Sequence, residues 1–216
     1  MSFSTIFFDL DGTLTDPEQG ICQSIIYALE KGGYPHGNVP DYHQWIGPPL
    51  IDSFIGLLGV DSTEANRLLE YYRERFSTVG LFENTVYPGI PEMLASLKKS
   101  GKTLAVCTGK PTVYSEQILR HFSLDGYFDG IFGIGLEEEG KTKDATLREG
   151  MKTLGISSAE GCVMVGDRMH DTIGAAAVGM ESIYVLYGYG SETEASGCSP
   201  THVVQTVENL KRLLLE

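Results

Sequence analysis

The chain has 216 residues, of which 42% are hydrophobic and 21% are charged, and its formal net charge is −13. This length allows either one good hydrophobic core or a core domain that carries a smaller inserted domain. A chain with this much negative charge is expected to repel nucleic acid and anionic membrane surfaces. None of its apolar runs is long enough to span a bilayer.

The first predicted element is a short strand at Thr5–Phe8, which ends in an acidic turn. Neither a basic segment nor a cleavage site accompanies this apolar run, so we do not interpret it as a signal peptide. We therefore expect a cytoplasmic protein.

Helical patterns without a convincing strand follow from about Asp16 to Val86. They lie at Pro17–Lys31, Pro49–Leu58 and Thr63–Thr78, separated by segments rich in glycine and proline. We interpret residues 16–83 as a smaller all-helical domain inserted after the first strand, with linkers at Gly12–Asp16 and Glu83–Pro88.

The rest of the chain alternates helical patterns with apolar strands. The helical patterns lie at Pro88–Ser100, Thr112–Phe122, Lys143–Leu154 and Asp171–Val178, and the strands at Thr103–Cys107, Gly130–Ile134, Cys162–Val165 and Ser182–Leu186. Mostly continuous apolar runs are typical of parallel strands covered on both faces. Residues 1–15 and 84–216 are thus predicted to form a Rossmann-like α/β core, a parallel sheet flanked by helices.

Polar side chains follow several of these strands at their carboxyl ends. Asp9 and Asp11 follow the first strand, Thr108 and Gly109 the second, and Asp167 the fourth, with Asp171 four residues later. Ligands of open α/β sheets bind beyond the carboxyl ends of the strands, so these side chains are expected to share one pocket.

So many carboxylates repel one another unless a cation lies between them. Oxygen ligands suit Mg²⁺, which would also help an anionic phosphate ester to approach a carboxylate nucleophile. The hydroxyl of Thr108 and backbone N–H groups of the following turn could hold phosphate oxygens, and a lysine could supply the remaining positive charge.

These residues resemble four ordered motifs of the haloacid dehalogenase superfamily. The matching segments are Asp9-Leu10-Asp11-Gly12-Thr13-Leu14, Thr108-Gly109, a following lysine, and Gly166-Asp167-Arg168-Met169-His170-Asp171. The resemblance covers the whole chain, including a helical cap inserted after the first motif. Trp45-Ile46-Gly47-Pro48-Pro49-Leu50 and Leu186-Tyr187-Gly188-Tyr189-Gly190 are similar to the phosphoglycolate phosphatase-like branch.

The resemblance implies a role for each matching residue. Asp9 would be the nucleophile, and Asp11 the acid that protonates the leaving alcohol and then the base that activates water. Thr108, Gly109 and a lysine would hold the transferring phosphoryl group together with Asp9.

The same resemblance implies a magnesium site. Asp9, the backbone carbonyl of Asp11 and Asp167 would bind the ion. Asp171 would act either on the ion or behind its ligands, and Thr13 would support them.

Two lysines after the third strand compete for the phosphate. Lys143 begins an apolar-periodic helix and is followed by Asp144, as the family pattern requires, so we favour it over Lys141. Lys110 is expected at a helix start rather than on the phosphate.

The sequence thus predicts a Mg²⁺-dependent phosphatase that hydrolyses a small phosphate ester through an aspartyl-phosphate. The branch resemblance favours a substrate like 2-phosphoglycolate, with a 5'-nucleotidase or a sugar-phosphate phosphatase as alternatives. A phosphomutase and a non-catalytic sensor of a phosphate ligand are further alternatives, whereas Asp11 argues against a dehalogenase.

Overall fold

The computed structural model describes residues 3–136, 138 and 140–216. It divides into two compact units, Met1–Asp16 with Val86–Glu216, and Pro17–Thr85. The sequence places these boundaries slightly earlier, after residues 15 and 83. Within the described residues, no helix has both the length and the apolar character needed to cross a membrane.

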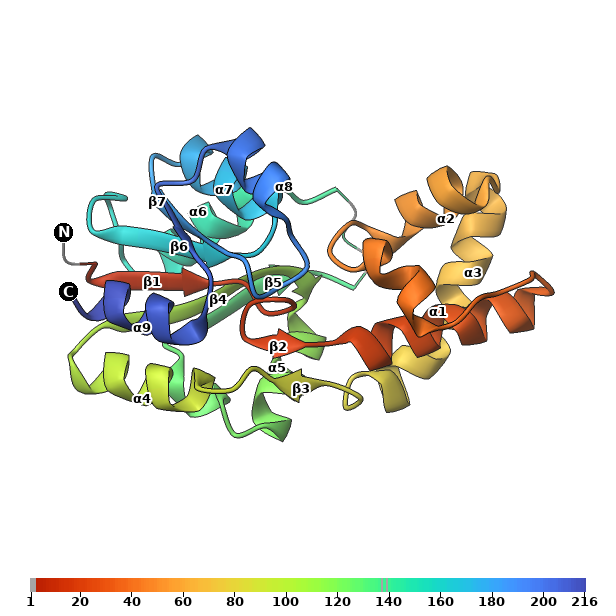
Figure 1. The fold of residues 1–216 in the computed structure, drawn as a ribbon, viewed down its shortest axis with the longest axis horizontal. Helices are drawn as coiled ribbons and strands as arrows, with labels where there is room; N and C mark the ends of the chain where they lie inside the picture. Colours follow the sequence, from red (N-terminus) through yellow and green to blue (C-terminus); the bar gives the residue numbers. More distant parts are fainter. Residues whose placement is uncertain (1–2, 137, 139) are drawn as a thin grey trace. The chain divides into compact units, whose positions relative to one another are not determined.

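A parallel sheet forms the centre of the larger unit (Figure 1). Its strands run in the order β5 (Gly130–Ile134), β4 (Thr103–Pro111), β1 (Thr5–Phe8), β6 (Cys162–Gly166), β7 (Glu181–Val185) and β8 (His202–Val204). Phe8 is in register with Val106 of β4 and Val165 of β6. The carboxyl ends of β1, β4 and β6 therefore lie level, and the residues after them meet at one edge of the sheet.

Helices cover both faces of this sheet, as Figure 1 shows. On one face α6 (Lys143–Thr153) packs against α7 (Met169–Ala177), and on the other α4 (Ile90–Lys99) packs against α9 (Val207–Leu215). Further elements of this unit are α5 (Thr112–His121), η3 (Asp125–Tyr127) and α8 (Glu192–Cys198). The predicted α/β architecture with a parallel sheet is confirmed.

The core forms because the central strand presents apolar side chains to both layers. Every residue of β1 is buried, and Phe7 shares a cluster with Leu147 of α6 and Met164 of β6. Gly150 lets α6 approach this cluster, because a Cβ there would lie 3.0 Å from the Phe7 ring. Removing such apolar surface from water is the main favourable term in folding.

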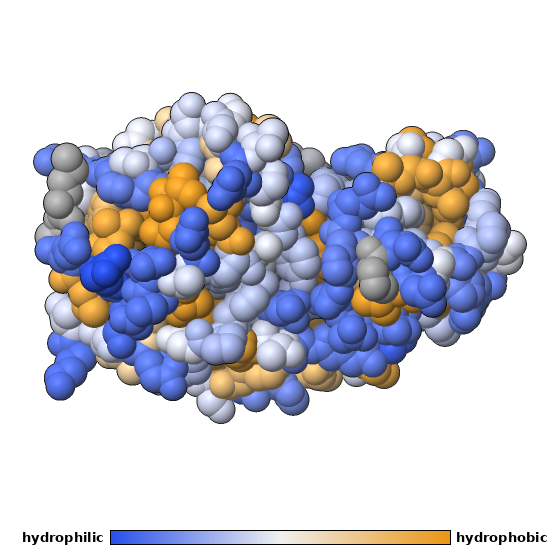
Figure 2. Space-filling view, viewed as in Figure 1, coloured by the Kyte–Doolittle hydropathy of each residue, from blue (hydrophilic) through white to orange (hydrophobic). Residues whose placement is uncertain are grey.

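The smaller unit is helical. It contains α1 (Glu18–Gly32), η1 (Val39–Trp45), α2 (Leu50–Leu58), α3 (Ser62–Arg75) and the π-helix η2 (Phe76–Gly80). The ring of Trp45 packs edge-on between Tyr42 and Phe54, at 5.4 and 5.6 Å between centroids. Arg75 pairs with Glu83 at 2.7 Å and donates to the Ser24 hydroxyl. By contrast, α2 leaves Ile55 and Leu57 exposed, and Figure 2 shows apolar surface over this helix.

Several short or irregular elements differ from the sequence prediction. The expectation of no strand between Asp16 and Val86 is wrong at both ends, where β2 (Thr15–Asp16) pairs with β3 (Thr85–Val86). Strand β8 and helices α8 and α9 were not predicted, and β4 continues to Pro111 through a shift of register after Cys107. Elements of two or three residues are too short to show a periodic pattern.

Candidate active site

Asp9 lies directly after β1, at the carboxyl edge of the sheet. Its N–H donates to the carbonyl of Val165 at 2.8 Å, which continues the pairing of β1 with β6. The N–H of Leu10 donates to Asp9 Oδ1 at 2.8 Å and orients the carboxylate. The backbone thus fixes both the position and the direction of this side chain.

A tight turn after Asp9 returns the chain to the site. Gly12 has φ of 78°, and a Cβ on it would lie 2.2 Å from Asp167 Oδ2, so only glycine fits there. Asp11 Oδ2 lies 2.8 Å from Lys110 Nζ, and Oδ1 is buried without a hydrogen-bond partner among the described residues. Burial raises the pKa of Asp11, and Lys110 opposes this shift only in part.

The end of β4 supplies Thr108, whose side chain is buried. Its Oγ1 accepts a hydrogen bond from the N–H of Lys110 at 3.2 Å. Gly109 is exposed, and a Cβ there would meet no atom within 4 Å. The backbone at this turn is therefore open on its outer side.

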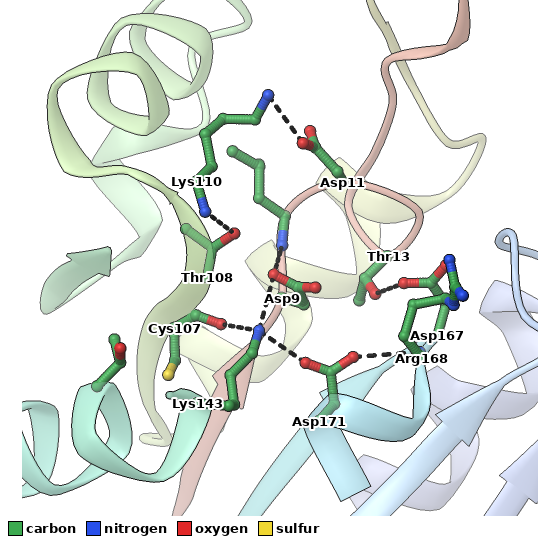
Figure 3. A network of polar contacts seen from close by, with 12 residues as sticks. Asp9, Asp11, Thr13, Cys107, Thr108, Lys110, Lys143, Asp167, Arg168 and Asp171 are labelled. Carbon is green, nitrogen blue, oxygen red and sulfur yellow. Dashed lines mark hydrogen bonds and ion pairs between the residues drawn. The ribbon is translucent and has the colours of Figure 1, made fainter. Parts of the chain in front are cut away.

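Lys143, the first residue of α6, lies at the centre of the polar network in Figure 3. Its Nζ lies 2.7 Å from Asp171 Oδ1 and 3.2 Å from Asp9 Oδ1, and it donates to the carbonyl of Cys107 at 3.1 Å. Burial alone would lower the pKa of Lys143, but Asp171 and Asp9 outweigh it and hold the pKa above its usual value. The side chain is therefore a buried, permanent cation beside Asp9.

Asp167 follows β6 and is almost completely buried. Its Oδ2 accepts from the N–H of Tyr189 at 2.8 Å and its Oδ1 from the Thr13 hydroxyl at 3.4 Å. Burial raises the pKa of Asp167 well above its usual value, and the charges of Asp171 and Asp9 raise it further. An ionised Asp167 thus requires a nearby positive charge.

Asp171 lies in the first turn of α7, and its side chain points to Lys143. Its Oδ2 accepts from the N–H of Arg168 at 3.2 Å, which caps the helix. Burial raises the pKa of Asp171, Lys143 lowers it, and the net shift is upward.

The carboxylates of Asp9, Asp167 and Asp171 fit a divalent cation. One oxygen from each lies within 4.8 Å of the others; Asp167 and Asp171 are buried and Asp9 is half-buried. Oxygen donors alone suit a hard ion such as Mg²⁺. Such an ion would offset both the burial and the repulsion by Asp171 and Asp9 that raise the pKa of Asp167.

The structure brings most of the predicted site residues together. Lys143 and Asp171 contact Asp9 and each other, and Thr13 contacts Asp167. The carboxylate of Asp11 instead pairs with Lys110. The contacts described for Lys141 do not include Asp9: its Nζ pairs with Glu149 at 2.7 Å and donates to the carbonyl of Gly133.

Other contact residues were not assigned from the sequence. Lys110 was expected at a helix start, but it lies in the extended end of β4 and its ammonium faces Asp11. Tyr187 donates to the carbonyl of Thr13 at 3.0 Å, and Tyr189 binds Asp167 through its N–H and Asp16 through its hydroxyl. Only the motif Leu186-Tyr187-Gly188-Tyr189-Gly190 marked this loop, because no local pattern reveals the contacts of Tyr187 with Thr13 and of Tyr189 with Asp16, which are 174 and 173 residues apart in sequence.

Comparison with known proteins finds similar chains over the whole length. The model of a family described as haloacid dehalogenase-like hydrolase matches residues 6–185. A 5'-nucleotidase from Pseudomonas aeruginosa is 41% identical, and the match covers 99% of this chain and 96% of that protein. A phosphoglycolate phosphatase from Colwellia psychrerythraea is 28% identical, with coverage of 95% and 94%.

Two further matches extend this comparison. The tyrosine-protein kinase PtkA from Mycobacterium tuberculosis is 35% identical, and the match covers 97% of this chain and 72% of that protein. The crystal structure of a predicted phosphatase from Clostridium acetobutylicum superposes with a TM-score of 0.93 and 40% identity, covering 100% of this chain and 99% of that one.

Proposed function

The chain belongs to the haloacid dehalogenase-like hydrolase family and is a phosphoric monoester hydrolase, and we propose that it acts through an aspartyl-phosphate on Asp9 with the help of Mg²⁺. The family membership confirms the resemblance inferred from the motifs. The observation that best supports the mechanism is the position of Asp9, which faces the ammonium of Lys143 and shares an oxygen cluster with Asp167 and Asp171.

In the first proposed step, a carboxylate oxygen of Asp9 attacks phosphorus opposite the ester oxygen. The phosphorus–oxygen bond of the ester breaks as Asp11 gives its proton to the departing alkoxide. This step leaves an aspartyl-phosphate and a free alcohol.

In the second step, the ionised Asp11 takes a proton from water as the water oxygen attacks phosphorus. The bond between Asp9 and phosphorus breaks, which releases inorganic phosphate and restores the Asp9 carboxylate and the Asp11 proton. Thr108 and the N–H groups near Gly109 hold the phosphoryl oxygens during both steps, and Lys143 balances their charge.

We propose that Mg²⁺ is bound by Asp9, Asp167 and the backbone carbonyl of Asp11, with Asp171 on the ion or behind its ligands. The bound ion would stabilise negative charge that develops on the phosphoryl oxygens. Thr13 and the N–H of Tyr189 hold Asp167 in place for this role.

Two substrate classes have support. The branch motifs and a relative named phosphoglycolate phosphatase favour an ester like 2-phosphoglycolate. The higher identity to a protein named 5'-nucleotidase favours a nucleoside monophosphate.

Phosphate release from a panel of esters, measured with Mg²⁺ and with a chelator, tests the proposal. We expect Mg²⁺-dependent release that is lost in Asp9→Asn, and the wild type should incorporate label from a ³²P-ester into the protein under acid quench. Full turnover by Asp9→Asn, or equal turnover in the chelator, would contradict the proposal.

A further inference from the structure

Lys110, near the end of β4, has no role in the mechanism described above, although it pairs with Asp11. Lys110 Nζ lies 2.8 Å from Asp11 Oδ2, and the lysine side chain is only 7% exposed. Lys110 follows Gly109 in the segment where β4 shifts register against β5, and its N–H is tied to the Thr108 hydroxyl. The ammonium is therefore held at the site and is not a freely moving surface charge.

The two buried lysines of the site lie on different sides of Asp9. In Figure 3, Lys143 approaches Asp9 from the side of Asp171, whereas Lys110 and Asp11 lie on the opposite side. All contacts described for Lys143 are with Asp9, Asp171 and the carbonyl of Cys107. The two cations consequently serve different regions of the pocket.

The chemistry of the proposed reaction indicates which part of the bound substrate would lie next to Lys110. Asp11 can protonate the leaving alkoxide only if the ester oxygen lies within hydrogen-bond distance of its carboxylate. Lys110 is at ion-pair distance from the same carboxylate. Its ammonium therefore lies beside the first atoms of the leaving alcohol rather than beside the transferring phosphoryl group.

We propose that Lys110 determines specificity by pairing with an anionic group on the leaving alcohol, a carboxylate whose carbon is two bonds from the ester oxygen. The proposal rests on the proposed function, because it uses Asp11 to locate the leaving alcohol. It names α-carboxyalkyl phosphates as the preferred class over esters of neutral alcohols, including nucleoside 5'-monophosphates. In a chain of net charge −13, a buried cation at this point also offsets the repulsion of a second anionic group.

A matched pair of substrates measures the contribution of the leaving-group carboxylate to kcat/KM. 2-Phosphoglycolate and 2-hydroxyethyl phosphate have alkyl leaving groups of the same length, and they differ in carrying a carboxylate or a hydroxymethyl group. We expect the wild type to prefer the glycolate ester in kcat/KM. In Lys110→Met, this preference should fall by at least about tenfold, mainly through KM, because a charge-assisted contact is lost.

Three variants control the interpretation. Lys110→Arg keeps the charge and should retain part of the preference, whereas Lys110→Gln should lose it as Lys110→Met does. Lys152→Met removes an exposed lysine of α6 and should leave the preference unchanged. If Lys110→Met and Lys110→Gln slow both esters by the same factor, the lysine only holds Asp11, and the proposal is overturned.

The same assay separates this inference from the proposed function. If Asp9→Asn still hydrolyses both esters, the proposed function fails. If wild-type hydrolysis depends on Asp9 but shows no preference between the two esters, the role of Lys110 alone is wrong.

Discussion

Lys143 Nζ lies 2.7 Å from Asp171 Oδ1, and the two groups come from the first turns of neighbouring helices. Helix α6 packs on α7, and Gly174 of α7 makes this approach possible because a Cβ there would lie 2.7 Å from the Cβ of Lys143. The ion pair thus fixes the ammonium beside Asp9 through the packing of two helices.

Replacement of Lys143 by Met should lower kcat/KM by about 10²–10³-fold, the usual effect of losing one buried donor to a developing negative charge. It should also destabilise the metal-free protein by about 3–5 kcal/mol, because Asp171 would lose its buried partner. Steady-state kinetics and urea unfolding in a chelator measure these two effects.

Lys141→Met is the matched control, because Lys141 pairs with the half-exposed Glu149. Its kcat/KM should stay within about twofold of the wild type, because the contacts described for its ammonium are with Glu138, Glu149 and the carbonyl of Gly133 and not with Asp9. A larger loss of activity in Lys141→Met than in Lys143→Met would show that Lys141, not Lys143, binds the phosphate.

Mg²⁺ should stabilise the folded protein, since Asp9, Asp167 and Asp171 repel one another without it. At a hundredfold excess over Kd, linkage predicts about 2.7 kcal/mol of added stability. Asp167→Asn should abolish this gain without lowering Tm in a chelator, because the amide carries no buried charge. Differential scanning calorimetry with and without Mg²⁺ measures both.

Glu160→Gln, which removes an exposed acid of the same unit, should keep the full Mg²⁺-dependent rise in Tm. If Asp167→Asn showed the same Mg²⁺-dependent rise in Tm as this control, Asp167 would not be a ligand of the ion and the proposed metal site would be wrong.

The sequence predicts the position of a site residue well where that residue directly follows a recognisable strand. Asp9, Thr108 and Asp167 each follow an apolar run, and the parallel topology alone places such ends at one edge of a sheet. The choice of Lys143 over Lys141 rested instead on a predicted helix start and on the following Asp144, and in the structure Lys143 is the first residue of α6.

The pairing of Lys110 with Asp11 could not be predicted in this way. It depends on β4 continuing beyond Cys107 through a shift of register, and a register shift leaves no periodic signal. The contacts of Tyr187 and Tyr189 depend on how a loop folds back over the first turn, which tertiary packing decides.

Gly188→Ala should destabilise the protein and weaken Mg²⁺ binding together. A Cβ on Gly188 would lie 2.2 Å from the Gly12 carbonyl and 2.5 Å from the Cβ of Asp167, so the loop must move away from the site. We expect a loss of about 1–3 kcal/mol in urea unfolding and a higher Kd in Mg²⁺ titration. Gly126→Ala, whose Cβ would meet no atom within 4 Å, should change neither measurement appreciably.

In the helical unit, Gly20 and Gly56 should respond to alanine in opposite directions. A Cβ on Gly20 would lie 2.0 Å from the Gly80 carbonyl, and the N–H of Gly20 donates to the carbonyl of Glu83, so α1 would have to separate from η2. Gly56 lies within α2 and a Cβ there would meet no atom within 4 Å. Gly56→Ala should therefore stabilise the protein by about 0.5–1 kcal/mol through its helix propensity, whereas Gly20→Ala should destabilise it by about 1–3 kcal/mol. Urea unfolding followed by circular dichroism measures both, and equal effects of the two variants would show that α1 and η2 do not approach so closely.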